Sequence, residues 1–249
     1  MLKLSGVIIT FNEERNIERC LQSLVGVADE IVVVDSYSTD ATKSICKKYD
    51  VQFIEQEFLG YVEQKNFALE QASFNHIVSL DGDEALSEEL QESIKNIKTN
   101  WTQDGYYCNR YNNFCGQWIR YSDWYPNRKL RVFDKSKAQW KGINPHDNVV
   151  LNNPKQKAGF LKGDILHWTY QTYQEMDKKT EYFSTIAAQA YLENNKTAPL
   201  WKLAWNPFWA FFKAYFLRLG FLDGLNGLRI CYQTGKITYL KYKKLRATK

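Results

Sequence analysis

Three short polar clusters contain most of the residues of this 249-residue chain that could do chemistry. They are Thr10–Glu14, Asp35–Asp40 and Asp81–Glu84, and each directly follows a run of apolar residues. The third cluster is the most informative, because Asp81 and Asp83 lie two residues apart on a glycine turn. Mg²⁺ in proteins typically uses one or two carboxylates plus substrate phosphates. A cation held in this way would neutralise a diphosphate leaving group.

Over the first hundred residues, the elements that must position these clusters alternate between the apolar pattern of strands and that of helices. We expect strands at 4–10, 30–34, 51–54 and 76–80, and helices at 12–24, 38–49, 61–72 and 87–97. Asn12 and Ser87 are the expected helix caps. This βαβα order predicts an α/β fold with a mostly parallel sheet and helices on both faces. Ligands of such sheets bind beyond the carboxyl ends of the strands, where all three clusters would lie.

The pattern changes after Asn100. Residues 104–170 are rich in aromatic residues, Asn and Gly, and we expect an antiparallel β-rich insertion that builds onto the sheet. Residues 172–194 have a helical pattern. Residues 200–219 form an aromatic helix that we expect Pro207 to interrupt.

Several classes of protein are disfavoured. The chain has no G-x-G-x-x-G after its first strand and no P-loop motif, which argues against dinucleotide and P-loop sites. The five cysteines include no C-x-x-C pair, so we expect reduced thiols in a cytoplasmic protein. The N-terminus does not read as a signal peptide, and no run of 18 apolar residues predicts a membrane span.

Charge is unevenly distributed along the chain. Residues 194–249 contain eleven Lys and Arg and one acid, Asp223, and carry +10, whereas residues 1–193 carry −5. Aromatic and cationic side chains together suit the interface of an anionic membrane. A core-packing helix is the alternative. A nucleic-acid role is disfavoured, because the body is acidic and no RNA or DNA motif is present.

The segments TFNEE, VDSYSTDAT, FLGYVEQKNFAL and IVSLDGDEALSEEL, in this order, resemble the family 2 glycosyltransferases with a GT-A fold. RKLRVF at 128–133 and PHD at 145–147 continue the likeness, which is closest to the bacterial lipopolysaccharide-core β-1,4-glucosyltransferase group. The resemblance implies an inverting, metal-dependent transfer of one sugar, glucose from UDP-glucose, to a lipopolysaccharide-core or other cell-envelope glycan. The Q-x-x-R-W signature of processive members is absent, which favours addition of a single sugar.

Carried over to the matching positions, the resemblance also implies site residues. The nucleotide-sugar donor would be bound by Thr10, Asn12, Glu14, Asp35, Lys65 and Asp81. Mg²⁺ or Mn²⁺ would be held by Asp83 and His167. Inverting transfer needs a general base for the acceptor hydroxyl, and Asp147 is the candidate. Many relatives have His-Glu where this chain has His-Asp, so Asp123 is a reserve candidate.

The expected organisation is a GT-A domain at 1–193 and a basic, aromatic extension at 194–249. Within the domain, 1–100 would bind the nucleotide sugar and 101–193 would face the acceptor. The extension would hold the enzyme at the inner face of the cytoplasmic membrane, near a lipid-linked acceptor. A sugar-phosphate nucleotidyltransferase is one alternative, although TFNEE lacks the Gly-rich phosphate loop usual there. A non-catalytic membrane-associated binding module is another, against which the complete acidic clusters argue.

Overall fold

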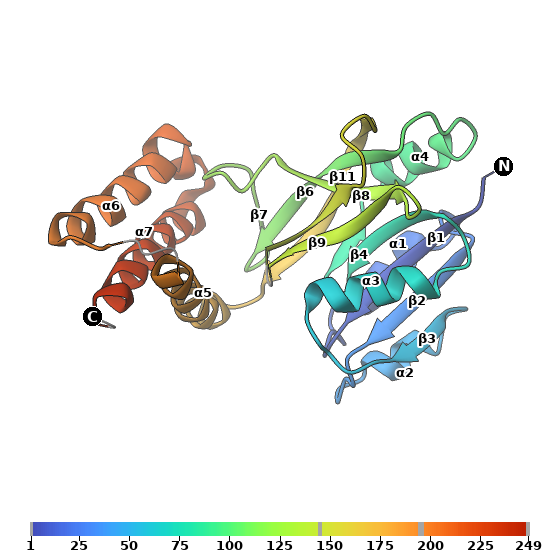
Figure 1. Ribbon diagram of the computed structural model, residues 1–249, viewed down its shortest axis with the longest axis horizontal. Coiled ribbons are helices and arrows are strands. Elements are labelled where there is room, and N and C mark those ends of the chain that lie inside the picture. The colour runs from blue at the N-terminus through green and yellow to red at the C-terminus, as the bar shows by residue number, and fades with distance from the viewer. Residues whose placement is uncertain (1, 144–145, 194–196, 248–249) are drawn as a thin grey trace. The chain divides into compact units, whose positions relative to one another are not determined.

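The computed structural model describes residues 2–143, 146–193 and 197–247. It divides into two compact units (Figure 1). The first unit contains residues 1–110 and 127–168, and the second contains residues 111–126 and 169–249. Pro145 of the PHD segment lies outside the described residues.

The first unit begins with four parallel strands. They are β1 (Leu4–Thr10), β2 (Glu30–Asp35), β3 (Gln52–Glu55) and β4 (His76–Asp81), in the order β3-β2-β1-β4. The helices between and after them are α1 (Ile17–Leu24), α2 (Thr42–Cys46), α3 (Tyr61–Gln71) and α4 (Glu88–Ile97). The register pairs Thr10 with Asp35 and Ile9 with Asp81. The ends of three strands therefore reach the same edge, as the sequence predicts.

The sheet continues beyond β4 with antiparallel strands. In spatial order these are β8 (Asn127–Asp134), β6 (Gly105–Phe114), β11 (Ala158–Tyr170) and β5 (Glu84–Leu86). A separate antiparallel pair is formed by β9 (Ala138–Ile143) and β10 (His146–Leu151). The expected antiparallel insertion is thus confirmed, and the whole is the predicted mixed α/β fold.

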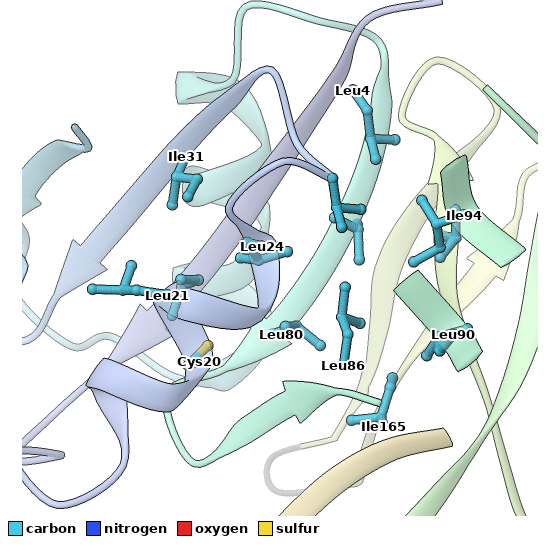
Figure 2. Packing of buried hydrophobic residues seen from close by; sticks show 14 of the residues in the cluster. Leu4, Cys20, Leu21, Leu24, Ile31, Leu80, Leu86, Leu90, Ile94 and Ile165 are labelled. Carbon is cyan, nitrogen blue, oxygen red and sulfur yellow. The ribbon is translucent and has the colours of Figure 1, made fainter. Parts of the chain in front are cut away.

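Both faces of the parallel sheet are covered. On one face, Leu21 and Leu24 of α1 and Leu90 of α4 pack with Leu4 and Leu80 of the strands (Figure 2). The other face packs against α3 and the β9–β10 pair, with Ala68, Leu69, Trp140 and Val149 in one cluster with strand residues. Successive side chains of a strand point to opposite faces, so a strand covered on both sides is apolar throughout. This explains why β1 and β2 appear in the sequence as nearly continuous apolar runs.

One of the two expected helix caps is confirmed. Ser87 Oγ accepts hydrogen bonds from the backbone N–H groups of Leu90 at 3.2 Å and Asp164 at 3.0 Å. The expectation for Asn12 is wrong, because α1 begins at Ile17. The Asn12 backbone has a left-handed φ of 54°. Its side chain is used by a neighbouring loop instead, as described below.

The second unit is mainly helical. It contains α5 (Tyr173–Glu193), α6 (Leu200–Phe212), a π-helical turn (Lys213–Leu217), a 3₁₀ turn (Gly220–Asp223) and α7 (Gly224–Ala247). The short strand β7 (Gln117–Ile119) pairs with the end of β6. None of the helices among the described residues is both long and apolar enough to cross a membrane.

The expected interruption at Pro207 is wrong, because α6 continues through it to Phe212. A helical proline removes one backbone hydrogen bond, and tertiary packing can offset that loss. Here α6 lies close to α7 at Gly235, where a Cβ atom would be only 3.1 Å from the Pro207 carbonyl oxygen. The close approach of the two helices therefore supports the helix at its weakest point.

Candidate active site

Three of the predicted donor residues form hydrogen bonds in two strand-end loops, and two of them, Asn12 and Glu14, join one loop to the other. Asp35 is buried and accepts a hydrogen bond from the backbone N–H of Ser38 at 2.7 Å. Asn12 Oδ1 accepts from the backbone N–H of Thr39 at 2.8 Å. Glu14 Oε2 accepts from the backbone N–H of Ala41 at 3.1 Å. These side chains shape the edge on which the donor is expected.

Thr10 lies beside the glycine turn of the third cluster. Its hydroxyl is buried and has no hydrogen-bond partner among the described residues. A Cβ atom at Gly82 would lie 2.8 Å from that oxygen, so the turn needs glycine to approach β1 this closely. A buried polar group is normally hydrogen-bonded, so this hydroxyl is available to a group bound at the edge.

Lys65 brings two predicted site residues together from different elements. Its Nζ atom lies 2.9 Å from Asp81 Oδ1 at the end of β4 and 2.7 Å from Asp147 Oδ2 on β10. The Lys65 side chain is only 4% exposed, and its Nζ lies 4.3 Å from the centre of the Trp140 ring. Lys65 is therefore not a solvated surface residue of α3. The structure places Lys65, Asp81 and Asp147 in one ion-paired group.

Further charged residues, which the sequence analysis did not single out, complete this group. Arg131 Nη2 lies 3.3 Å from Asp81 Oδ2 and 3.2 Å from Glu84 Oε1. Arg110 Nη1 is 3.4 Å from the same Glu84 oxygen. Glu84 is fully buried, and its other oxygen accepts from the backbone N–H of Asp81 at 3.1 Å. The available signals were Glu84 directly after the Asp-Gly-Asp turn and Arg131 in RKLRVF.

The pKa values follow from this pairing. Burial disfavours the charged form of Asp81, but Lys65 and Arg131 outweigh burial and hold the pKa of this carboxyl well below its usual range. Burial likewise lowers the pKa of Arg131, but Glu84 and Asp81 outweigh it and raise that pKa above its usual value. Asp81 and Arg131 are therefore both charged at neutral pH.

Asp83 and His167, the two residues predicted to hold a cation, face each other. Asp83 Oδ2 lies 3.2 Å from His167 Nε2, and the Asp83 carbonyl accepts from the backbone N–H of Trp168 at 3.0 Å. The β5–β11 pairing, which aligns Glu84 with His167, sets this position. No group of three or more His, Cys, Asp or Glu side chains among the described residues could hold a metal ion. One carboxylate and one imidazole fit a cation whose other ligands are substrate phosphates and water.

Asp123, the reserve candidate for the base, is not part of the ion-paired group in the first unit. Asp123 belongs to the second unit, has a left-handed φ of 66° and lies 3.0 Å from Arg218 Nε. All five cysteines are free. Burial raises the pKa of the Cys108 thiol to about 12, which makes it a poor nucleophile at neutral pH.

Comparisons with known proteins show the family of the chain. Residues 5–154 match the family model described as glycosyl transferase family 2. An uncharacterized glycosyltransferase of Rickettsia prowazekii is 32% identical, and the match covers 99% of this chain and 87% of that one. The lipopolysaccharide core biosynthesis glycosyltransferase LpsC of Rhizobium meliloti is 31% identical, with 90% and 83% covered.

The fold is also similar to a solved structure. The crystal structure of residues 1–349 of TarS from S. aureus matches with a TM-score of 0.50 and 16% identity, covering 100% of this chain and 92% of that one. A structure of the same TarS fragment in complex with UDP has the same TM-score. At this identity the likeness concerns the GT-A fold alone.

The central role of Lys65 can be tested through stability. Lys65→Gln leaves two buried or half-buried carboxylates short of a cation, and breaking a buried pair in this way costs about 3 kcal/mol or more. The matched control is Lys43→Gln, which removes a more exposed pair with Glu55 and should cost less than about 1 kcal/mol. Urea unfolding at pH 7 measures both free energies. Equal losses in the two variants would contradict the proposed importance of the buried group.

Proposed function

The chain belongs to glycosyl transferase family 2 and is a glycosyltransferase, and on that premise we propose that it moves one glucose from UDP-glucose, with inversion, to a cell-envelope glycan. The observation that carries the proposal is the ion-paired group in which Lys65 joins Asp147 to the strand-end Asp81. The UDP complex of TarS supports a UDP-sugar donor. The name of LpsC supports a lipopolysaccharide-core acceptor.

We assign Asp147 as the general base for this reaction. In a single displacement, the acceptor oxygen bonds to the anomeric carbon as the bond to the diphosphate breaks, which inverts the configuration. The acceptor hydroxyl must lose its proton to a carboxylate in that step. Lys65 pairs with both Asp147 and Asp81. The Asp147 carboxylate therefore lies beside the sheet edge proposed for the donor.

The strand-end residues have the chemistry to bind a nucleotide sugar. We assign Thr10, Asn12, Glu14 and Asp35 to the nucleoside, Asp81 to the ribose and Lys65 to a phosphate. Asp83 and His167 would hold Mg²⁺ or Mn²⁺, which would neutralise the diphosphate as it leaves. The family assignment disfavours the nucleotidyltransferase and the non-catalytic module.

We further propose that residues 194–249 bind the inner face of the cytoplasmic membrane, where a lipid-linked acceptor would lie. None of the described α6 residues is buried, and Trp201, Trp205 and Trp209 are 59%, 56% and 46% exposed. The one acid of this segment, Asp223, is buried and accepts hydrogen bonds from the backbone N–H groups of Arg120 and Tyr121. The surface charge of the segment is therefore cationic, which suits anionic lipid.

Donor and metal use can be tested together. We expect the protein to release UDP from UDP-glucose, among a panel of nucleotide sugars, when Mn²⁺ or Mg²⁺ is present. Asp83→Asn should lower this activity by about 100-fold or more, because it removes the carboxylate ligand. Asp50→Asn, at an exposed position of the same unit, is the control. Full activity in excess chelator, or in Asp83→Asn, would exclude the metal assignment.

The base can be tested by steady-state kinetics with a glycan acceptor. Asp147→Asn should lower kcat by about 100-fold to 10,000-fold with little change in the KM for the donor, since a base acts mainly in the transition state. Asp147 also pairs with Lys65, so UDP affinity should be measured in the same variant. If UDP binding is lost while turnover persists, Asp147 is a donor contact, and Asp123 becomes the better candidate.

Membrane binding can be tested by cosedimentation with vesicles. The intact protein should bind anionic vesicles more tightly than neutral ones, and salt should weaken the difference. Trp205→Ser with Trp209→Ser should reduce binding by about tenfold or more, because it removes inserted aromatic area. Tyr182→Ser changes an exposed aromatic on α5 and is the control. Failure to bind either vesicle type would contradict the proposal.

Point substitutions are preferable to truncation after Glu193 in this test. Ala188 of α5 packs with Tyr242 and Leu245 of α7 in one buried cluster. Removing α7 would therefore expose apolar surface on α5, and any change in vesicle binding would be hard to assign to α6.

A further inference from the structure

A pocket lies beside Asp147 in the first unit. It has a volume of about 180 Å³ and is formed by side chains from β6, β8, β9 and β10. Its charged and aromatic lining residues are Tyr107, Arg128, Lys129, Arg131, Trp140 and Asp147. The three strand-end clusters contribute no residue to this lining. Asp147 and Arg131 therefore belong both to the ion-paired group and to the lining of this pocket.

Two cations of this pocket are not neutralised within the described part of the chain. Arg131 is paired with Asp81 and Glu84. By contrast, Arg128 and Lys129 form no ion pair with a described carboxylate. The Arg128 guanidinium lies 5.4 Å from the centre of the Phe160 ring, and Lys129 Nζ donates to Asn148 Oδ1 at 3.3 Å. The pocket thus has positive charge that its own residues do not use.

Lys129 lies near two other cationic side chains, Arg110 and Arg131. The pKa of Lys129 is lowered, first by burial and then by Arg110 and Arg131. Glu84 and Asp147 oppose this effect without cancelling it. A bound anion would favour the charged form of Lys129, and hydrogen bonds between ionised groups are among the stronger ones in proteins.

We propose that this pocket binds an anionic group, a phosphate or a carboxylate, carried by the sugar acceptor. The inference rests on the proposed function, in which Asp147 is the base for the acceptor hydroxyl. Whole-ligand pockets are typically about 300–1,000 Å³, so a pocket of about 180 Å³ suits one charged group and part of its sugar. Tyr107 and Trp140 offer aromatic faces for the ring. An acceptor anchored by Arg128 and Lys129 would present a neighbouring hydroxyl to Asp147.

The test compares three simple sugars as probes of the complete protein by titration calorimetry. They are glucose 6-phosphate, glucuronate and uncharged glucose. We expect the wild type to bind at least one anionic sugar about tenfold or more tightly than glucose. The tighter of the two anions distinguishes a phosphate from a carboxylate. Equal binding of charged and neutral sugars, or no measurable binding of either anion, would overturn the proposal.

Variants locate the preference in the pocket. The double variant Arg128→Gln with Lys129→Gln should lose the preference for anions, and Arg128→Gln alone, at an exposed position, should weaken it with little risk to folding. Lys162→Gln removes one exposed cation of the same unit outside the pocket and should keep the preference. Retention of the full preference in the double variant would place the anion elsewhere.

UDP affinity, measured on the same proteins, separates this proposal from the proposed function. UDP should bind the double variant as it binds the wild type, because the pocket shares no residue with the strand-end clusters. A parallel loss of UDP binding would mean that the cations serve the donor, and would overturn the acceptor assignment. If the wild type does not bind UDP at all, the proposed donor fails, whereas the anion preference is judged from the three sugars alone.

Discussion

The mutual neutralisation of buried charges is the constraint on which the first unit depends. Glu84 and Arg131 are almost completely removed from solvent, and removing an ion from water costs several kcal/mol unless partners compensate. Each member of the group belongs to a different part of the fold, with Lys65 on α3, Arg131 on β8 and Asp147 on β10. Their pairing therefore holds the parallel strands, the antiparallel strands and the β9–β10 pair in one arrangement. A purely apolar contact would be less demanding of geometry, because ion pairs need both distance and direction.

The side chains of the site come from two kinds of element, the parallel strands and the antiparallel strands. The parallel strands end together at one edge, which supplies backbone turns and the side chains of Asp35 and Asp81. The antiparallel strands supply groups from the other direction, namely Arg131, Asp147 and His167. A sheet that changes from parallel to antiparallel at β4 can thus surround a ligand with groups that no single strand end could present. The chemistry proposed for the chain needs such an arrangement, because donor and acceptor must meet between the two sets.

The sequence predicted correctly those features that depend only on neighbouring residues. Continuous apolar runs predicted β1 and β4 correctly, and Ser87 caps α4 because a cap needs only its own next turn. Local pattern failed where the partner is distant. Asn12 has the residue type of a cap, but its oxygen bonds to a loop 27 residues away. Arg131 pairs with Asp81, 50 residues away, and nothing in a single sequence encodes that pairing. Pro207 remains helical because a second helix packs against it, which propensity alone does not include.

The charged residues of the site in the first unit comprise a buried group of ion pairs and further charges at its margins. Lys65, Arg110 and Arg131 face Asp81, Glu84 and Asp147, so the buried group contains equal numbers of positive and negative charges. Such a balanced group has little net charge, and its ion pairs hold each member, including Lys65, Asp81 and Asp147, in a fixed position. The charges outside this balance lie at its margins, with Asp83 beside His167 and with Arg128 and Lys129 in the pocket next to Asp147. A carboxylate with an imidazole suits a cation, whereas two cationic side chains without an ion-pair partner suit an anion. If the balanced group fixes the geometry, then substitutions of these marginal charges should alter ligand selectivity more than folding, whereas substitutions within the group should affect both.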